Sequence, residues 1–251
     1  MAQQRLDKII ASTGRYSRRE VKTLVREGRV LVDGRIAASA EDKCDPLTAR
    51  ISVNGEELFY REHTYVMLHK PAGVLSATED GRGETVLDLL APEYRKIGLF
   101  PVGRLDKDTE GLLLLTDDGA LAHDLLTPKK HVDKGYFART DGALDDADCK
   151  AFEQGITLGD GLECLPAKLE ILKSDAQSEA LITIREGKFH QIKRMLASRG
   201  KPVVYLKRLS MGSLTLDEGL SKGEYRMLTA EEIKNLRESG QFAQGKAGAD
   251  K

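Results

Sequence analysis

Four aspartates near the middle of this 251-residue sequence are the first candidates for chemistry. Asp106 and Asp108 lie on a polar segment that leads into a run of apolar residues, and Asp117 and Asp118 follow that run. A carboxylate on a loop that enters a core strand is held rigidly, which suits a reactive group. Aspartate also stabilises turns by accepting hydrogen bonds from nearby backbone amides. The four residues taken alone therefore leave a catalytic and a structural role open.

The elements that must position these carboxylates are short and mostly apolar. Strands are predicted over residues 64–70, 111–116, 137–140 and 181–185. Lys134 and Tyr136 come just before the third of these strands, in a basic segment. Many short strands with few helices favour an α+β fold, with a mostly antiparallel sheet in the larger domain.

A helix is predicted from about residue 189 to residue 199, and it separates apolar from basic side chains. Its apolar stripe comprises Phe189, Ile192 and Leu196. Its other side comprises His190, Lys193, Arg194 and Ala197. A glycine and a proline that follow at positions 200 and 202 are typical of a helix end.

Metal, disulfide and membrane chemistry are not indicated by the sequence. The three cysteines at 44, 149 and 164 are widely spaced and form no C-x-x-C pair. The five histidines have no spacing typical of metal ligands, so we expect no metal site. No apolar run reaches the ~18–20 residues of a membrane span, and the N-terminal residues lack a secretory apolar core. We therefore expect a cytoplasmic protein.

The charge is balanced in total but segregated along the chain. Lysine and arginine number 39 and aspartate and glutamate 40, a formal net charge of −1. Residues 1–35 nevertheless carry a net charge of +5, residues 140–180 carry −7, and residues 185–208 carry +7. Such segregation allows basic surfaces that bind phosphates, although charged residues also simply solvate helix faces. Charge alone does not decide between these interpretations.

The N-terminal block is predicted to form two short helices and a hairpin. Ser17 and Glu20 have the S-x-x-E spacing of a capping box at the start of the second helix. An Asp33-Gly34 turn between apolar residues is typical of a tight β-hairpin. Basic side chains gather at the start of the second helix, where the helix dipole also favours a phosphate. They are Arg15, Arg18, Arg19 and Lys22.

This order of elements resembles the S-four (alpha-L) RNA-binding domain. The resemblance covers residues 1–59, and a segment rich in charged residues around Tyr60 is the expected linker. The domain occurs in a ribosomal protein, in tyrosyl-tRNA synthetases and in RNA-modifying enzymes. It implies that the four basic side chains contact RNA. A basic helical domain that binds protein is the alternative.

The rest of the sequence resembles the catalytic domain of the RsuA-type ribosomal RNA pseudouridine synthases (the RsuA/RluB/E/F family). The matching segments occur in family order: HKPAGV (69–74), GRLDKDTEGLLLLTDDG (103–119), K-x-Y (134–136), EGKFHQIKRM (186–195), LKRLSMG (206–212) and GEYRMLTAEEI (223–233). The resemblance implies a catalytic domain over residues 60–238, with a mixed, bent sheet, and leaves residues 239–251 as a tail that we expect to be disordered.

The resemblance also implies a role for single residues. Asp106 is the family's catalytic aspartate, a nucleophile or a base that acts on the ribose. Lys193 supplies the cation that keeps this carboxylate ionised, and Tyr136 stacks on the target uracil. No cofactor is expected, since the reaction oxidises nothing and releases no group.

Further positions are predicted to contact RNA. Arg104 either fills the gap left by a flipped base or clamps a phosphate. Lys70, His190 and Arg194 are also expected at the RNA, with a structural contact as the alternative for His190. Gly135 departs from the residues that many relatives have between the lysine and the tyrosine, and its freedom could loosen the tyrosine.

The resemblance favours a cytoplasmic, monomeric isomerase that modifies ribosomal RNA or a pre-ribosomal particle. The motif HQIKRM favours the small-subunit 16S RNA as substrate. Relatives that act on large-subunit RNA more often have the sequence N-R-Q-V-R-R-M at this place. The same chemistry on large-subunit RNA is one alternative. A non-catalytic RNA-binding factor of ribosome assembly is another, although binding alone does not require the aspartate, tyrosine and lysine together.

Overall fold

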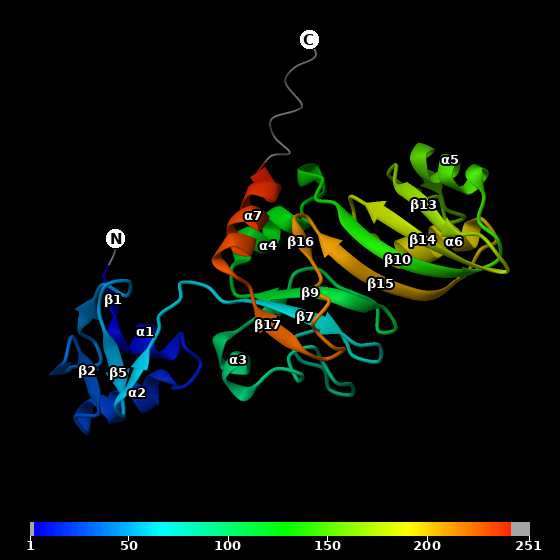
Figure 1. The fold of residues 1–251 in the computed structure, drawn as a ribbon. Coiled ribbons are helices and arrows are strands. Elements are labelled where there is room, and N and C mark those ends of the chain that lie inside the picture. Colours follow the sequence, from blue (N-terminus) through cyan, green and yellow to red (C-terminus); the bar gives the residue numbers. More distant parts are fainter. Residues whose placement is uncertain (1–2, 242–251) are drawn as a thin grey trace, which may run out of the picture. The chain divides into compact units, whose positions relative to one another are not determined.

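The computed structural model describes residues 3–241, which divide into two compact units (Figure 1). The first unit joins the residues up to Thr64 with Leu90–Leu99, and the second joins Tyr65–Leu89 with the residues from Phe100 onward. The segment 90–99 was expected in the larger domain. It belongs to the first unit, where the carbonyl of Glu93 lies 2.2 Å from the position that a Cβ on Gly14 would take. Only a glycine permits so close an approach of the two backbones.

The first unit contains three short helices beside small sheets. The helices are α1 (Leu6–Ala11), α2 (Arg18–Arg26) and α3 (Pro92–Ile97). The strands are β1 (Gln4–Arg5), β2 (Val30–Val32), β3 (Arg35–Ile36), β4 (Lys43–Cys44), β5 (Ile51–Val53) and β6 (Glu56–Leu58). β1 pairs with β4, and the other four strands form one sheet in the order β3-β2-β5-β6.

The local predictions for this unit are confirmed. The Ser17 hydroxyl accepts a hydrogen bond from the Glu20 amide, and the Glu20 carboxylate accepts one from the Ser17 amide, which is the predicted capping box. Asp33 and Gly34 have φ values of 51° and 78°, the left-handed backbone that a two-residue hairpin turn between β2 and β3 requires.

The second unit is built on a nine-stranded sheet with the order β13-β14-β10-β15-β9-β7-β17, in which β8 pairs with β9 and β16 with β15. Its strands are β7 (Tyr65–Lys70), β8 (Phe100–Pro101), β9 (Glu110–Thr116), β10 (Lys134–Asp141), β13 (Lys168–Lys173), β14 (Gln177–Ile184), β15 (Val203–Met211), β16 (Leu214–Thr215) and β17 (Tyr225–Met227). β9 and β15 run parallel, and the other described pairs are antiparallel. The predicted mixed, mostly antiparallel sheet is therefore confirmed.

Helices and a short hairpin complete the second unit. They are α4 (Gly119–Leu126), the 3₁₀ turn η1 (Pro128–Lys130), α5 (Asp146–Gln154), the hairpin β11 (Ile156–Thr157) and β12 (Glu163–Cys164), α6 (Gln191–Ser198) and α7 (Ala230–Gln241). In Figure 1, α4 lies beside α7, and α5 lies beside β13. Helix α7 extends three residues into the tail expected to be disordered, and residues 242–251 lie outside the described residues.

The centre of the sheet is the most buried part of this unit. Every residue of β7 and of β9 is buried, including the run Leu112–Leu115, in which each residue has no exposed surface. Burial of so many apolar side chains fixes these two strands. Each buried side chain stabilises the folded state by on the order of 1.5–3 kcal/mol relative to an exposed one. The loop between β8 and β9, which carries the predicted aspartate, is therefore attached to the most rigid part of the fold. No helix among residues 3–241 is both long and apolar enough to span a membrane.

Candidate active site

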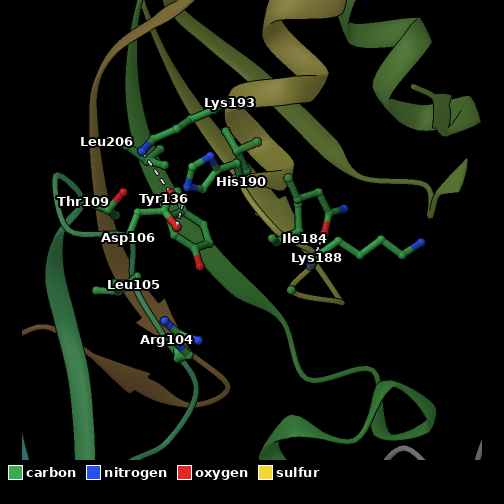
Figure 2. A pocket seen from close by; sticks show the side chains of 13 residues that line it. Arg104, Leu105, Asp106, Thr109, Tyr136, Ile184, Lys188, His190, Lys193 and Leu206 are labelled. Atoms are coloured by element: carbon green, nitrogen blue, oxygen red, sulfur yellow. Dashed lines mark hydrogen bonds and ion pairs between the residues drawn. The ribbon is translucent and has the colours of Figure 1, made fainter. Parts of the chain in front are cut away.

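One pocket brings together residues of the loop before β9, the strands β10, β14 and β15, and the start of α6 (Figure 2). Five residues that the sequence singled out line it: Arg104, Asp106, Tyr136, His190 and Lys193. The rest of the lining comprises Leu105, Thr109, Ile184, Gly187, Lys188, Gln191, Ile192 and Leu206. Segments separated by up to about one hundred residues of sequence thus meet at one place.

Asp106 is held by hydrogen bonds of the loop backbone on both sides of it. The hydroxyl of Ser76 donates to the Leu105 carbonyl at 2.9 Å and accepts from the Leu105 amide at 3.1 Å. The amide of Thr109 donates to the Asp106 carbonyl at 3.1 Å. The Asp106 side chain itself is 27 % exposed, so the carboxylate faces the pocket from a fixed backbone.

Lys70 supports the same loop from inside the protein. Its ammonium donates hydrogen bonds of 3.0–3.3 Å to four backbone carbonyls, those of Pro71, Asp106, Lys107 and Thr109. Burial lowers the pKa of this ammonium to about 8, against the opposing effect of nearby carboxylates. The expectation that Lys70 contacts RNA is wrong in this structure, because the residue has no exposed surface and its donors are directed at the loop.

Lys193 projects from α6 and bridges two carboxylates. Its ammonium lies 2.9 Å from Asp106 Oδ2 and 2.5 Å from Asp108 Oδ1. Burial acts to lower the pKa of Lys193, but the hydrogen bonds to Asp108 and Asp106 outweigh it and raise that pKa above its ordinary value. The hydrogen bond from Lys193 in turn lowers the pKa of the Asp108 carboxyl. The Lys193 ammonium, with its pKa raised, thus stands against the Asp106 carboxylate.

The segment before α6 differs from its predicted form. His190 adopts a left-handed backbone with φ 50°, and α6 begins after it at Gln191, about two residues later than expected. His190 Nε2 lies 3.5 Å from Asp106 Oδ1. Phe189 lies outside the helix with 75 % of its surface exposed, so the prediction that it belongs to the apolar stripe of the helix is wrong, while Ile192 and Leu196 are buried. The left-handed turn at His190 redirects the chain before α6, so Phe189 is not part of the helix.

Tyr136 enters the pocket from the central strand β10. It is 8 % exposed and is opposite Ile182 on one neighbouring strand and Arg208 on the other. A Cβ on Gly135 would lie 2.5 Å from the Ser210 hydroxyl, and the register shifts between Gly135 and Tyr136. Gly135 lies in a strand that is paired on both sides, and this pairing restrains its backbone.

Two predicted RNA contacts differ in their surroundings. Arg104 is exposed at the pocket (Figure 2) and forms no hydrogen bond or ion pair with the residues that the structure describes. Arg194 lies outside the pocket lining, 2.6 Å from Asp160. Arg104 is therefore available to a ligand, whereas Arg194 already has an acidic partner.

The predicted RNA contacts of the first unit are all exposed, and two of them form surface ion pairs. The exposed residues are Arg15, Arg18, Arg19 and Lys22. Arg15 lies 3.0 Å from Glu56, and Lys22 lies 3.5 Å from Glu41. Exposed pairs of this kind contribute about 0–1 kcal/mol, so a phosphate can displace them at little cost. These side chains are not part of the pocket.

Several supporting residues were not identified from the sequence. Gln191 donates to Glu186 at 2.8 Å and accepts from the Lys188 amide at 3.1 Å, which fixes the turn before α6. Ser76 holds the aspartate loop from about thirty residues upstream, and no spacing in the sequence announces that contact. Thr109 lines the pocket at 2 % exposure, and its hydroxyl has no hydrogen-bond partner among the described residues. Within residues 3–241 no three His, Cys, Asp or Glu side chains form a group that could hold a metal ion.

Comparison with known proteins agrees with this arrangement. The family model for RNA pseudouridylate synthase matches residues 64–198, and that for the S4 domain matches residues 4–46. The chain is 50 % identical over 235 residues to "Uncharacterized RNA pseudouridine synthase YtzG" of Bacillus subtilis, which covers 93 % of this chain and 98 % of that protein.

Relatives named for both ribosomal subunits are similarly close. "Ribosomal small subunit pseudouridine synthase A" of Vibrio cholerae is 40 % identical, with 92 % of this chain and 99 % of that protein covered. "Ribosomal large subunit pseudouridine synthase B" of Bacillus subtilis is 39 % identical, with 93 % and 96 % covered. A crystal structure of a pseudouridylate synthase matches with a TM-score of 0.65 and 36 % identity, covering 93 % of this chain and 99 % of that one. The chain belongs to the RNA pseudouridylate synthase family and carries an S4 domain before its catalytic domain.

Proposed function

We propose that this protein converts a uridine of ribosomal RNA to pseudouridine, and that the uridine lies in the small-subunit 16S RNA. The observation that carries the proposal is the 2.9 Å ion pair between Lys193 and Asp106, in one pocket with Tyr136. The reaction breaks the bond between ribose C1′ and uracil N1 and joins C1′ to C5; C5 loses a proton and N1 gains one, so the composition is unchanged. Nothing is oxidised and no group leaves the RNA, so the proposal needs no cofactor.

Asp106 is the reactive group in this proposal. Its carboxylate either attacks the ribose or removes a proton from it, and both roles require the ionised form. The ammonium of Lys193 supports that form, because an opposite charge within about 4 Å favours an ionised carboxylate even when water is partly excluded. The loop contacts of Lys70 and Ser76 support the fixed placement that either role needs.

Tyr136 and Arg104 handle the base and the space that it leaves. Tyr136 lines the pocket, and its ring can offer an aromatic surface on which a uracil stacks. A uridine in a folded RNA must leave its stack before it reaches Asp106, at a cost of a few kcal/mol. Arg104, exposed and without a partner among the described residues, can stack in the vacated position or bind a phosphate.

The choice of the small-subunit RNA rests on the segment HQIKRM at the start of α6, whose sequence resembles that of the small-subunit enzymes. Identity with relatives does not separate the two subunits, since it is 40 % for one named for the small subunit and 39 % for one named for the large. The exposed basic side chains of the S4 domain suit the ribosomal RNA phosphates, free or in a pre-ribosomal particle in the cytoplasm.

The test is modification of ribosomal RNA by purified protein. Small- and large-subunit transcripts and pre-ribosomal particles are incubated with the protein, and pseudouridine is mapped at single-nucleotide resolution. We expect one modified uridine in the small-subunit RNA and a loss of turnover of at least about 10³-fold in Asp106→Asn, which keeps the size of the side chain. Modification confined to large-subunit RNA would refute the choice of subunit.

The same variant separates an enzyme from a binding factor. Asp106→Asn should bind the RNA as tightly as the wild type, since the substitution removes a negative charge and leaves the basic side chains in place. Turnover by Asp106→Asn at the wild-type rate would refute the assignment of Asp106. RNA binding without any pseudouridine in the wild-type reactions would favour the non-catalytic assembly factor.

A further inference from the structure

The rim of the catalytic pocket carries an aromatic side chain that the core does not use. Phe189 is 75 % exposed, although phenylalanine is among the most frequently buried residue types. Its ring stacks on the ring of His190, with centroids 3.8 Å apart and planes at 18°. His190 lines the pocket, and its Nε2 lies 3.5 Å from Asp106 Oδ1. The two stacked rings therefore adjoin the reactive carboxylate.

The segment that presents Phe189 is held firmly on both sides. The Lys188 amide donates to Gln191 Oε1 at 3.1 Å, and Gln191 Nε2 donates to Glu186 Oε1 at 2.8 Å. The Lys188 ammonium also contacts the Glu163 carbonyl. A ring fixed in this way loses little conformational entropy when a ligand stacks on it, which favours binding.

An RNA from which a base has been flipped offers a complementary surface. Extrusion of the target uridine removes a stacking partner from the base next to it. Stacking of a base on an aromatic side chain contributes about 1–3 kcal/mol and does not depend on which base is present. The nearby lysine ammonium groups already have acidic partners, Lys188 with Glu186 at 3.0 Å and Lys193 with Asp106 and Asp108, so the two rings offer stacking rather than additional charge.

We propose that Phe189 and His190 form a stacking platform for the unpaired base next to the target uridine. The platform binds the neighbouring nucleotide while Asp106 and Tyr136 act on the target, so Phe189 positions the RNA and takes no part in the bond changes. This inference rests on the proposed function. It assigns the recognition of a flanking nucleotide to an exposed ring outside the pocket lining.

The test is a double-mutant cycle between the protein and the RNA. Phe189→Ala, Phe189→Trp and wild type are compared on the target RNA and on two versions that lack the base on either side of the uridine. We expect Phe189→Ala to weaken binding roughly 5- to 100-fold on the intact RNA, the range that corresponds to one lost stack. On one of the two abasic RNAs the same substitution should have no further effect, because its partner is already absent.

Two controls keep the result interpretable. Phe189→Trp retains an aromatic face and should restore affinity, and the loss in Phe189→Ala should fall on KM with kcat changed less than about twofold. Leu172→Ala on β13, half exposed and outside the pocket, should leave binding unchanged. Equal loss on the intact RNA and both abasic RNAs, or no loss on any, would overturn the platform. Wild-type protein that forms no pseudouridine would instead overturn the proposed function, and the platform with it.

Discussion

Replacement of Lys70 by methionine distinguishes an internal support of the aspartate loop from a contact to RNA. Methionine has a similar length and fills the same buried space without a donor. The ammonium of Lys70 now serves four backbone carbonyls, three of them in the loop from Asp106 to Thr109. The substitution leaves those oxygens without this donor and leaves the outer surface of the protein unchanged, since Lys70 has no exposed area.

Two opposing contributions set the loss of folding stability expected for Lys70→Met. The ammonium has three N–H groups, which the four carbonyls share; at the low end of about 1.5 kcal/mol for each charged hydrogen bond, they contribute about 4.5 kcal/mol. Burial of the charge is unfavourable: the drop in the pKa of Lys70 from 10.5 to about 8 corresponds to about 3 kcal/mol. We expect Lys70→Met to lower the free energy of unfolding by about 1.5 kcal/mol, the difference between these two contributions, and kcat to fall at least tenfold because Asp106 loses its fixed position.

The stability difference between the wild type and Lys70→Met should increase with pH. Between about pH 8 and pH 10 the folded protein releases the proton of Lys70, whereas the unfolded chain, with an ordinary lysine pKa, still holds it. Stability rises with pH wherever the unfolded state binds more protons. The wild type therefore gains roughly 2 kcal/mol between pH 7 and pH 10 from this group. Lys70→Met lacks the gain, so the gap between the two proteins should widen.

Urea unfolding followed by circular dichroism measures the stabilities, and RNA binding and single-turnover modification are measured alongside. Lys107→Met serves as the matched control, because it removes an exposed lysine of the same loop. Lys70→Met should bind RNA within about twofold of the wild type. The reasoning would be refuted by a Lys70→Met protein that is as stable as the control at every pH but binds RNA more weakly, since that result would make Lys70 an RNA contact.

Two further predictions concern the scaffold. Gly111→Ala should lower the free energy of unfolding by at least about 3 kcal/mol, or prevent folding, because at φ +106° its Cβ would lie 2.2 Å from a backbone oxygen of β15. Gly135→Ala should lower it by less than about 1.5 kcal/mol, because rotation of the Ser210 hydroxyl relieves the contact. Thermal unfolding of both variants measures the two losses, and equal losses would contradict the distinction. Ser17→Ala should remove one half of the α2 capping box and cost about 1 kcal/mol in calorimetry, with Ser52→Ala on β5 as the control, since the Ser52 hydroxyl forms no hydrogen bond with the described residues.

Much of the fold was predictable because its signals are local. The capping box of α2, the Asp33-Gly34 hairpin and the apolar run of β9 each depend on residues within a few positions of one another. The assignment of residues 90–99 was not predictable in this way. It depends on contact between the backbones of Gly14 and Glu93, which are far apart in the sequence, and neither residue type announces a partner.

The site was predictable in its membership and less so in its support. The motifs that resemble the family pointed to Asp106, Tyr136 and Lys193, and these residues line one pocket. The burial of Lys70 was not foreseen, because a lysine beside a predicted strand is ordinarily exposed, and only four converging carbonyls make its burial tolerable. The exposure of Phe189 is not predicted by helical periodicity, which starts the helix at residue 189, whereas the left-handed backbone of His190 delays the start of α6 to Gln191.

Charge along the sequence proved a poor guide to charge on the surface. The segment 185–208 carries a net charge of +7, but most of its cations have acidic partners in the fold. Asp148, from the acidic middle segment, binds both Arg199 and Lys201 at 2.9 and 2.7 Å, and Asp160 binds Arg194 at 2.6 Å. Acidic side chains of residues 140–180 thus neutralise part of the positive charge of residues 185–208. The positive potential near the pocket therefore comes from fewer side chains. On the proposed function, recognition of RNA would depend more on stacking and on single cations such as Arg104 than on a broad basic surface, and such contacts would favour one uridine over the many phosphates that every site on the RNA shares.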